Sequence, residues 1–146
     1  MVIGELKGKL VGLDTAPLIY FIEQHPTLHP KVKNVFELHA QQTFGFIVSV
    51  LTLTEVLVHP LREKDTKLAA KYKRIFEDAK GVTIAEMNKD IAVKAAELRA
   101  KYASLRTPDA IQLATAIHHR CDYFFSNDEA LKKITEIEVI TINDIA

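Results

Sequence analysis

Four acidic side chains stand where the pattern of apolar runs would bring them together. Asp14, Glu55 and Asp128 each come shortly after a short apolar run, and Asp109 lies at the start of a largely apolar helix. Carboxylate oxygens without His or Cys are typical ligands of Mg²⁺ or Mn²⁺, which keep several bound waters. Such a site can activate water and stabilise in-line displacement at a phosphodiester. The four acids therefore predict a metal site suited to phosphodiester hydrolysis.

Alternating strands and helices must position these acids. Short apolar runs bounded by turn residues predict strands, and apolar residues at three- and four-residue steps predict helices. Strands are expected at residues 10–13, 45–51, 81–84, 123–125 and 138–141, and helices at 15–23, 30–38, 52–58, 63–79, 88–102, 110–119 and 129–133. The alternation implies right-handed crossovers and a parallel α/β sheet of about five strands, covered by helices on both faces.

Local signals set the expected ends of two of these helices. Thr52 and Glu55 match a capping box, and the short helix that follows them should stop at Pro60. Thr107 is expected to cap the later apolar helix, with Pro108 at its first helical position.

Topology explains why acids that are distant in sequence should meet. In open parallel sheets, ligands lie beyond the carboxyl ends of the strands. The helix that begins near Asp109 runs antiparallel to the strand that ends before Asp128, so its first turn lies beside that strand end. Asp122 begins the same strand and belongs to the opposite edge. Glu86 and Asp90 also follow a strand, and their position alone does not exclude them.

Each acid also has a purely structural explanation. Asp14 could be a helix N-cap, Glu55 the capping-box partner of Thr52, Asp109 an acid that favours a helix dipole, and Asp128 a turn residue. These explanations do not account for the four acids sharing one edge. Because converging carboxylates repel one another, either their pKa values rise or a cation neutralises them.

The composition is that of an ordinary globular chain. Its 146 residues suit one domain spanning 1–146, with 48% hydrophobic and 26% charged residues. The single Cys121 leaves no internal disulfide and fits a reducing compartment. The first ten residues do not form a signal peptide, and no apolar run approaches a membrane span. We therefore expect a cytoplasmic protein with no membrane partner.

The formal net charge is zero, so an RNA partner would have to be held by a local basic patch. Arg106 is one candidate because it lies close to Asp109 in the sequence. A basic stripe at helical spacing is another, although such a stripe can equally be a solvated face; it consists of Lys64, Lys67, Lys71 and Arg74.

Four segments of the chain resemble those of a known family. They are LDTAPLIYFIE around Asp14, LTLTEVL around Glu55, LRTPDAIQLATAI around Asp109 and SNDEAL around Asp128. In this order and spacing the chain resembles PIN-domain proteins, and among them the VapC-type toxins of toxin–antitoxin pairs, over nearly its whole length from Leu10 onward. The resemblance implies a three-layer α/β/α sandwich and a Mg²⁺- or Mn²⁺-dependent endoribonuclease that cuts single-stranded or looped RNA.

Carried over by position, the resemblance makes all four acids, Asp14, Glu55, Asp109 and Asp128, catalytic and metal-binding. Ser126 stands where the family often has Thr, Asn127 fits the pattern, and with Arg106 these are candidates for substrate contact. The family further implies a homodimer and a cognate antitoxin that inserts into or beside the active-site groove.

Other functions remain open from the sequence. A PIN-domain nuclease of RNA processing without a toxin role, or a non-catalytic PIN scaffold, would show the same segments. A haloacid-dehalogenase-like phosphatase needs a second Asp where Ala16 stands, and a receiver domain needs a phosphorylated Asp and a Lys that this pattern does not supply.

Overall fold

A five-stranded parallel sheet forms the centre of the computed structural model, which describes residues 1–145. The strand order is β3-β2-β1-β4-β5, so the chain starts in the middle of the sheet and builds outward in both directions. The strands are β1 (Leu10–Leu13), β2 (Gly45–Ser49), β3 (Val82–Ala85), β4 (Tyr123–Ser126) and β5 (Glu138–Thr141).

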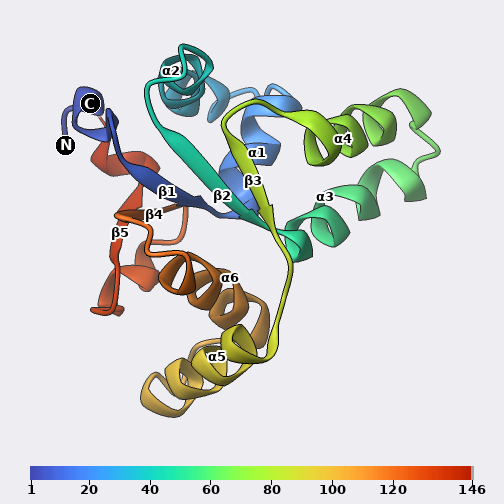
Figure 1. Ribbon diagram of the computed structural model, residues 1–146. Helices are drawn as coiled ribbons and strands as arrows, with labels where there is room; N and C mark the ends of the chain where they lie inside the picture. The colour runs from blue at the N-terminus through green and yellow to red at the C-terminus, as the bar shows by residue number, and fades with distance from the viewer. Residues whose placement is uncertain (146) are drawn as a thin grey trace.

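Helices cover both faces of this sheet, as Figure 1 shows. The α-helices are α1 (Thr15–Ile22), α2 (His29–Ala40), α3 (Val50–Arg62), α4 (Thr66–Asp78), α5 (Lys89–Lys101) and α6 (Thr107–His118). Short 3₁₀ helices are η1 (Ile3–Leu6), η2 (Glu129–Lys133) and η3 (Ile142–Asp144). The predicted α/β/α sandwich with a parallel sheet of five strands is therefore confirmed.

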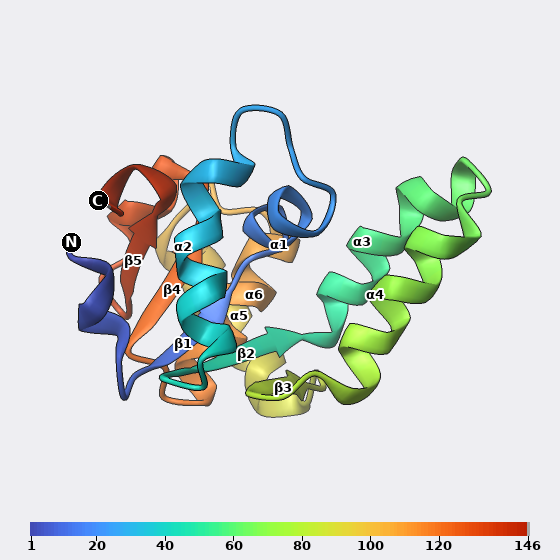
Figure 2. The same ribbon diagram turned by 90° about the horizontal axis from the view of Figure 1, so that it is seen from above.

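The two faces of the sheet carry separate apolar clusters. Phe124 packs with α5 and α6, whereas its neighbour Phe125 packs with the cluster under α1 and α2. Val139 and Ile140 divide between the two clusters in the same way, because successive side chains of a strand point to opposite faces. The α3–α4 pair extends away from the sheet beyond β3 (Figure 2).

The prediction for the second strand and its helix was wrong in its boundaries. The strand ends at Ser49, whose Oγ accepts a hydrogen bond from Leu51 N at 3.1 Å and caps α3. Thr52 is therefore inside the helix and caps nothing. The helix also continues through Pro60, because Pro60 is buried in the α3–α4 pair and packing outweighs the hydrogen bond that proline cannot donate.

Two other helix starts differ from expectation. Arg106, not Thr107, occupies the N-cap position of α6, although Pro108 falls in the first turn as predicted. Asp65 caps α4 by accepting a hydrogen bond from Leu68 N at 3.1 Å. The preceding Lys64 has a φ of 56° and stays outside the helix, which shortens the basic stripe on α4 to Lys67, Lys71 and Arg74.

Within residues 1–145, no helix combines the length and the apolar composition needed to cross a membrane.

Candidate active site

The four predicted acids line one hollow of about 420 Å³. Asp14 and Asp128 follow the ends of β1 and β4, and Glu55 and Asp109 come from the early turns of α3 and α6. The hollow is also lined by the three further candidates Arg106, Ser126 and Asn127, and by Thr15, Ala16 and Ile19. The structure thus brings together the four acids and these three candidates, whereas the residues of the basic stripe do not line this hollow.

The acids excluded or left open by sequence lie elsewhere. Asp122 Oδ2 accepts a hydrogen bond from Leu10 N at 2.9 Å, at the start of β1 and hence at the opposite edge. Glu86 and Asp90 are exposed and are not among the described residues that line the hollow.

Asp14 is both a helix cap and a member of the acidic group. Its Oδ1 accepts a hydrogen bond from Thr15 N at 2.8 Å, and its Oδ2 accepts one from Ser126 Oγ at 2.7 Å. Burial raises the pKa of Asp14, the bonds from Ser126 and Thr15 oppose that rise, and the charges of Asp109 and Glu55 add to it. The ionised form of Asp14 is therefore disfavoured by its surroundings, and a cation beside it would relieve this.

Ser126 connects Asp14 to the loop after β4. Its hydroxyl is fully buried, and while donating to Asp14 it accepts a hydrogen bond from Asp128 N at 3.0 Å. Asp128 Oδ1 accepts from Ala130 N at 3.0 Å and caps η2. Asn127 Nδ2 donates to the Tyr20 hydroxyl at 3.1 Å. This loop is therefore fixed relative to α1 by side-chain hydrogen bonds.

Asp109 is half-buried in the first turn of α6, where its carboxylate pairs with the exposed guanidinium of Arg106. Arg106 Nε lies 3.4 Å from Asp109 Oδ2, and the Arg106 side chain is 79% exposed. An exposed pair of this length contributes little to stability. The guanidinium is therefore available to contact an anionic ligand at the mouth of the hollow.

Glu55 is held by a polar group that the sequence did not indicate. Glu55 Oε1 accepts hydrogen bonds from Thr15 Oγ1 at 2.7 Å and from Gln112 Nε2 at 3.1 Å. Gln112 also donates to Thr52 Oγ1 at 2.8 Å. The only signal in the sequence was a glutamine among the apolar residues of α6, which spacing alone could not connect to Glu55.

The donor set fits a hard divalent cation. Oxygen atoms from four carboxylates line the hollow, and the surroundings of Asp14 favour a neighbouring positive charge. Across residues 1–145, no group of three or more His, Cys, Asp or Glu side chains is already closed around one point that a metal ion could occupy. The residue types are therefore suitable, and closure would need side-chain adjustment.

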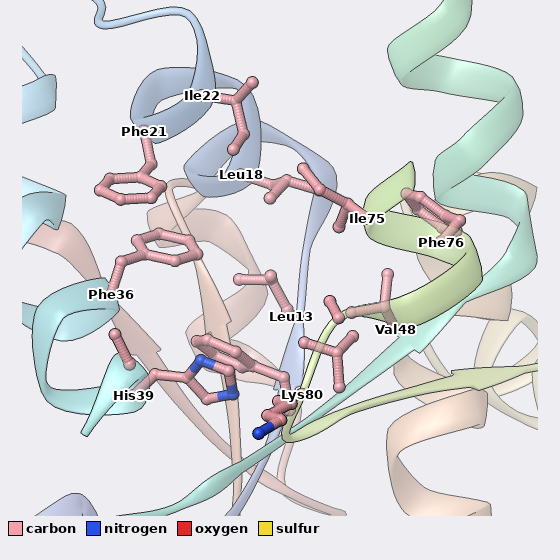
Figure 3. Close-up of a pocket in the computed structure, with 14 residues that line it drawn as sticks. Leu13, Leu18, Phe21, Ile22, Phe36, His39, Val48, Ile75, Phe76 and Lys80 are labelled. Carbon is pink, nitrogen blue, oxygen red and sulfur yellow. The ribbon is translucent and has the colours of Figure 1, made fainter. Parts of the chain in front are cut away.

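A second hollow, of about 240 Å³, is almost entirely apolar, and none of the four acids is among the described residues that line it (Figure 3). Phe21, Phe36 and Phe76 come from α1, α2 and α4, and the sheet forms its floor. His39 and Lys80 lie close to each other at one end of it (Figure 3). An apolar hollow with a cation at one end suits an apolar ligand that carries an acid.

Comparison with known protein families matches a PIN-domain model to residues 11–137. No curated protein sequence matches the chain.

Several solved structures share the fold. VapBC2 from Rickettsia felis, bound to a DNA fragment from their promoter, is 19% identical with a TM-score of 0.72, covering 90% of this chain and 98% of that chain. A toxin–antitoxin complex from Klebsiella pneumoniae is 25% identical with a TM-score of 0.69, covering 92% and 98%. VapC20 from Mycobacterium tuberculosis, a sarcin-ricin loop cleaving toxin, is 16% identical with a TM-score of 0.67, covering 88% and 98%.

Proposed function

The chain belongs to the PIN-domain family, and from this premise we propose that it is a metal-dependent endoribonuclease that hydrolyses RNA phosphodiester bonds. The observation that carries the proposal is the single hollow lined by Asp14, Glu55, Asp109 and Asp128 at the carboxyl ends of the strands. We further propose that residues 1–146 act as one PIN domain.

In this proposal the acids divide their work by position. Asp14, Asp109 and Asp128 would hold Mg²⁺ or Mn²⁺ directly or through water, and Glu55 would complete the set or orient the attacking water. When bound, the cation would polarise the scissile phosphate and lower the pKa of a coordinated water. In-line attack by water would leave a 5′-phosphate and a 3′-hydroxyl.

The neighbouring polar residues would serve two different purposes. Arg106 is exposed beside Asp109 and would contact an RNA phosphate. Asn127, half-buried beside the acids, would contact a base or a sugar. Ser126 is fully buried and donates to Asp14, so we assign it to holding that carboxylate rather than to contacting RNA.

The cellular role that fits best is the toxin of a type II toxin–antitoxin pair, acting in the cytoplasm. The solved structures with this fold include toxin–antitoxin complexes. The apolar hollow of Figure 3 would accept an apolar antitoxin segment that carries an acid toward Lys80. Val50, Val58 and Leu61 are exposed apolar residues on α3 and support a homodimer.

The decisive experiment is cleavage of a mixed pool of structured RNAs with Mn²⁺, with Mg²⁺ and with EDTA. Asp109→Asn should abolish metal-dependent cleavage. Asp90→Asn is the matched control, because Asp90 lies in the first turn of α5 as Asp109 does in α6, but outside the hollow. We expect the control to cleave like the wild type.

The same experiment separates the alternatives. Absence of cleavage under every condition, together with no Mn²⁺ binding by calorimetry, would refute the nuclease and support a scaffold. Cleavage that persists in EDTA would refute the metal requirement. A nuclease whose expression does not slow bacterial growth would support a role in RNA processing over a toxin.

A further inference from the structure

A buried polar cluster lies directly behind Glu55. It consists of Thr15, Thr52 and Gln112, which are 8%, 0% and 3% exposed and come from α1, α3 and α6. Buried polar groups are costly unless they form hydrogen bonds. Within residues 1–145, every side-chain hydrogen bond of these three residues is made within the cluster or to Glu55, so the cluster and this carboxylate form one unit.

Gln112 is the member with the least reason to be polar. Its neighbours Ala110 and Leu113 are fully buried, and an apolar side chain at 112 would fill the same interior without unsatisfied donors. Its amide nitrogen instead lies 2.8 Å from Thr52 Oγ1, 3.2 Å from Thr15 Oγ1 and 3.1 Å from Glu55 Oε1. The amide N–H groups of Gln112 thus donate to the two threonines and to Glu55.

The effect of these bonds falls on one carboxylate oxygen. Glu55 is exposed, and an exposed glutamate normally samples many rotamers. Two donors on Oε1, from Thr15 and Gln112, restrict that freedom. The second oxygen, Oε2, is left for the hollow that Glu55 lines together with the three aspartates.

We propose that Gln112 is a positioning residue that fixes the Glu55 carboxylate at the edge of the acidic hollow. Its hydrogen bonds to Glu55 and to the two threonines set the Glu55 rotamer, so α6 controls an acid carried by α3. The consequence for metal binding rests on the proposed function. The restriction of Glu55 does not.

The test uses Gln112→Met, which keeps the length of the side chain and removes both donors. Thr115→Val is the matched control: Thr115 is 3% exposed on the same helix, and its hydroxyl donates only to Ile111 O at 2.7 Å. Three-bond scalar couplings of Glu55, measured by NMR without metal, report whether its side chain keeps one rotamer. We expect averaged couplings in Gln112→Met and fixed couplings in the wild type and in Thr115→Val.

Mn²⁺ affinity, measured by calorimetry on the same proteins, provides the second readout. Loss of an outer partner of a metal ligand typically weakens metal affinity by about 10–100-fold, and we expect this for Gln112→Met alone. If Gln112 only stabilised the fold, Gln112→Met would instead have a lower urea midpoint, and its Glu55 couplings would stay fixed.

The outcomes distinguish the two proposals. Fixed Glu55 couplings in Gln112→Met would overturn the positioning role and leave the nuclease intact. Averaged couplings with the Mn²⁺ affinity of the wild type would support the positioning role and assign Glu55 to orienting the attacking water rather than to holding the metal. Averaged couplings in Gln112→Met, with no Mn²⁺ binding by the wild type, would support the positioning role and count against the nuclease.

Discussion

Gly12 of β1 packs against Ala116 of α6, and Gly12→Ala should disturb both the fold and the acidic hollow. A Cβ at this position would lie 2.6 Å from Ala116 Cβ and 3.1 Å from Phe124 Cδ1. Carbon atoms in good contact are about 3.5–4.0 Å apart, so α6 must move by about 1 Å. Overpacking of this kind typically destabilises a protein by about 1–3 kcal/mol.

The same movement would affect catalysis if the proposed function holds. Helix α6 carries Asp109 and Gln112, whereas Asp14 follows β1 directly. A misplacement of about 1 Å in a catalytic arrangement can lower the rate about 100-fold. We therefore expect Gly12→Ala to lower the free energy of unfolding in urea by about 1–3 kcal/mol and to slow RNA cleavage by up to about 100-fold.

A second substitution tests the cause. Ala116→Gly removes the clashing methyl group, after which the nearest atom of α6 is the Cα of residue 116 at 3.6 Å, an ordinary contact. Glycine inside a helix costs about 1 kcal/mol by itself. The double variant should therefore be more stable than the sum of the two single effects predicts, and should regain cleavage. Gly4→Ala is the control, because nothing lies within 4 Å of the added carbon.

A Gly12→Ala variant with the unfolding free energy and the cleavage rate of the wild type would refute the proposed clash. The clash would also be refuted if the effects of Gly12→Ala and Ala116→Gly were additive, because contacting residues with a shared clash should show coupling.

Three further variants test the site and its support. Burial raises the pKa of Asp14, so ionisation of this carboxyl destabilises the metal-free fold as pH rises through that pKa. Asp14→Asn should abolish cleavage, but in EDTA at pH 7 it should raise the melting temperature above that of the wild type. This gain in melting temperature should disappear when the pH falls below the ordinary aspartate range. Equal melting temperatures of Asp14→Asn and the wild type at both pH values would contradict this prediction. Arg106→Glu should weaken RNA binding, measured by fluorescence anisotropy, more than Lys67→Glu does, and the reverse order would reject our ranking. Tyr72→Phe removes a 2.6 Å bond to Glu23 and should lower the unfolding free energy in urea by about 1 kcal/mol, whereas an unchanged value would show that the bond is dispensable.

The meeting of distant acids followed from topology. A helix that returns antiparallel to a strand must begin beside that strand's carboxyl end, and this geometry predicted that Asp109 and Asp128 would be neighbours at one edge of the sheet. In the structure both residues line the same hollow. Strand periods and Pro in the first turn similarly located β1, α1 and α6 to within a few residues.

Side-chain partnerships were not accessible in the same way. Gln112 lies 57 positions from Glu55 and 97 from Thr15, and no local pattern encodes which oxygen a buried amide will meet. The sequence predicted a helix end at Pro60 because the hydrogen bond that proline cannot donate follows from the residue type, whereas its burial follows only from the fold. Periodicity, helix-start signals and sheet topology therefore predicted the course of the backbone. Tertiary packing determines which side chains form hydrogen bonds to the acids.

The structural and functional explanations of the acids do not exclude each other, and this determines how they should be mutated. Asp14 caps α1 and Asp128 caps η2, while both line the hollow. Asn caps a helix about as well as Asp, whereas Ala costs about 0.5–2 kcal/mol of stability. An Asn substitution thus removes the charge and keeps the cap, although at position 14 it replaces one of the two oxygens that accept hydrogen bonds from Thr15 and Ser126. An Ala substitution mixes both effects, and the difference between the two variants measures the cap.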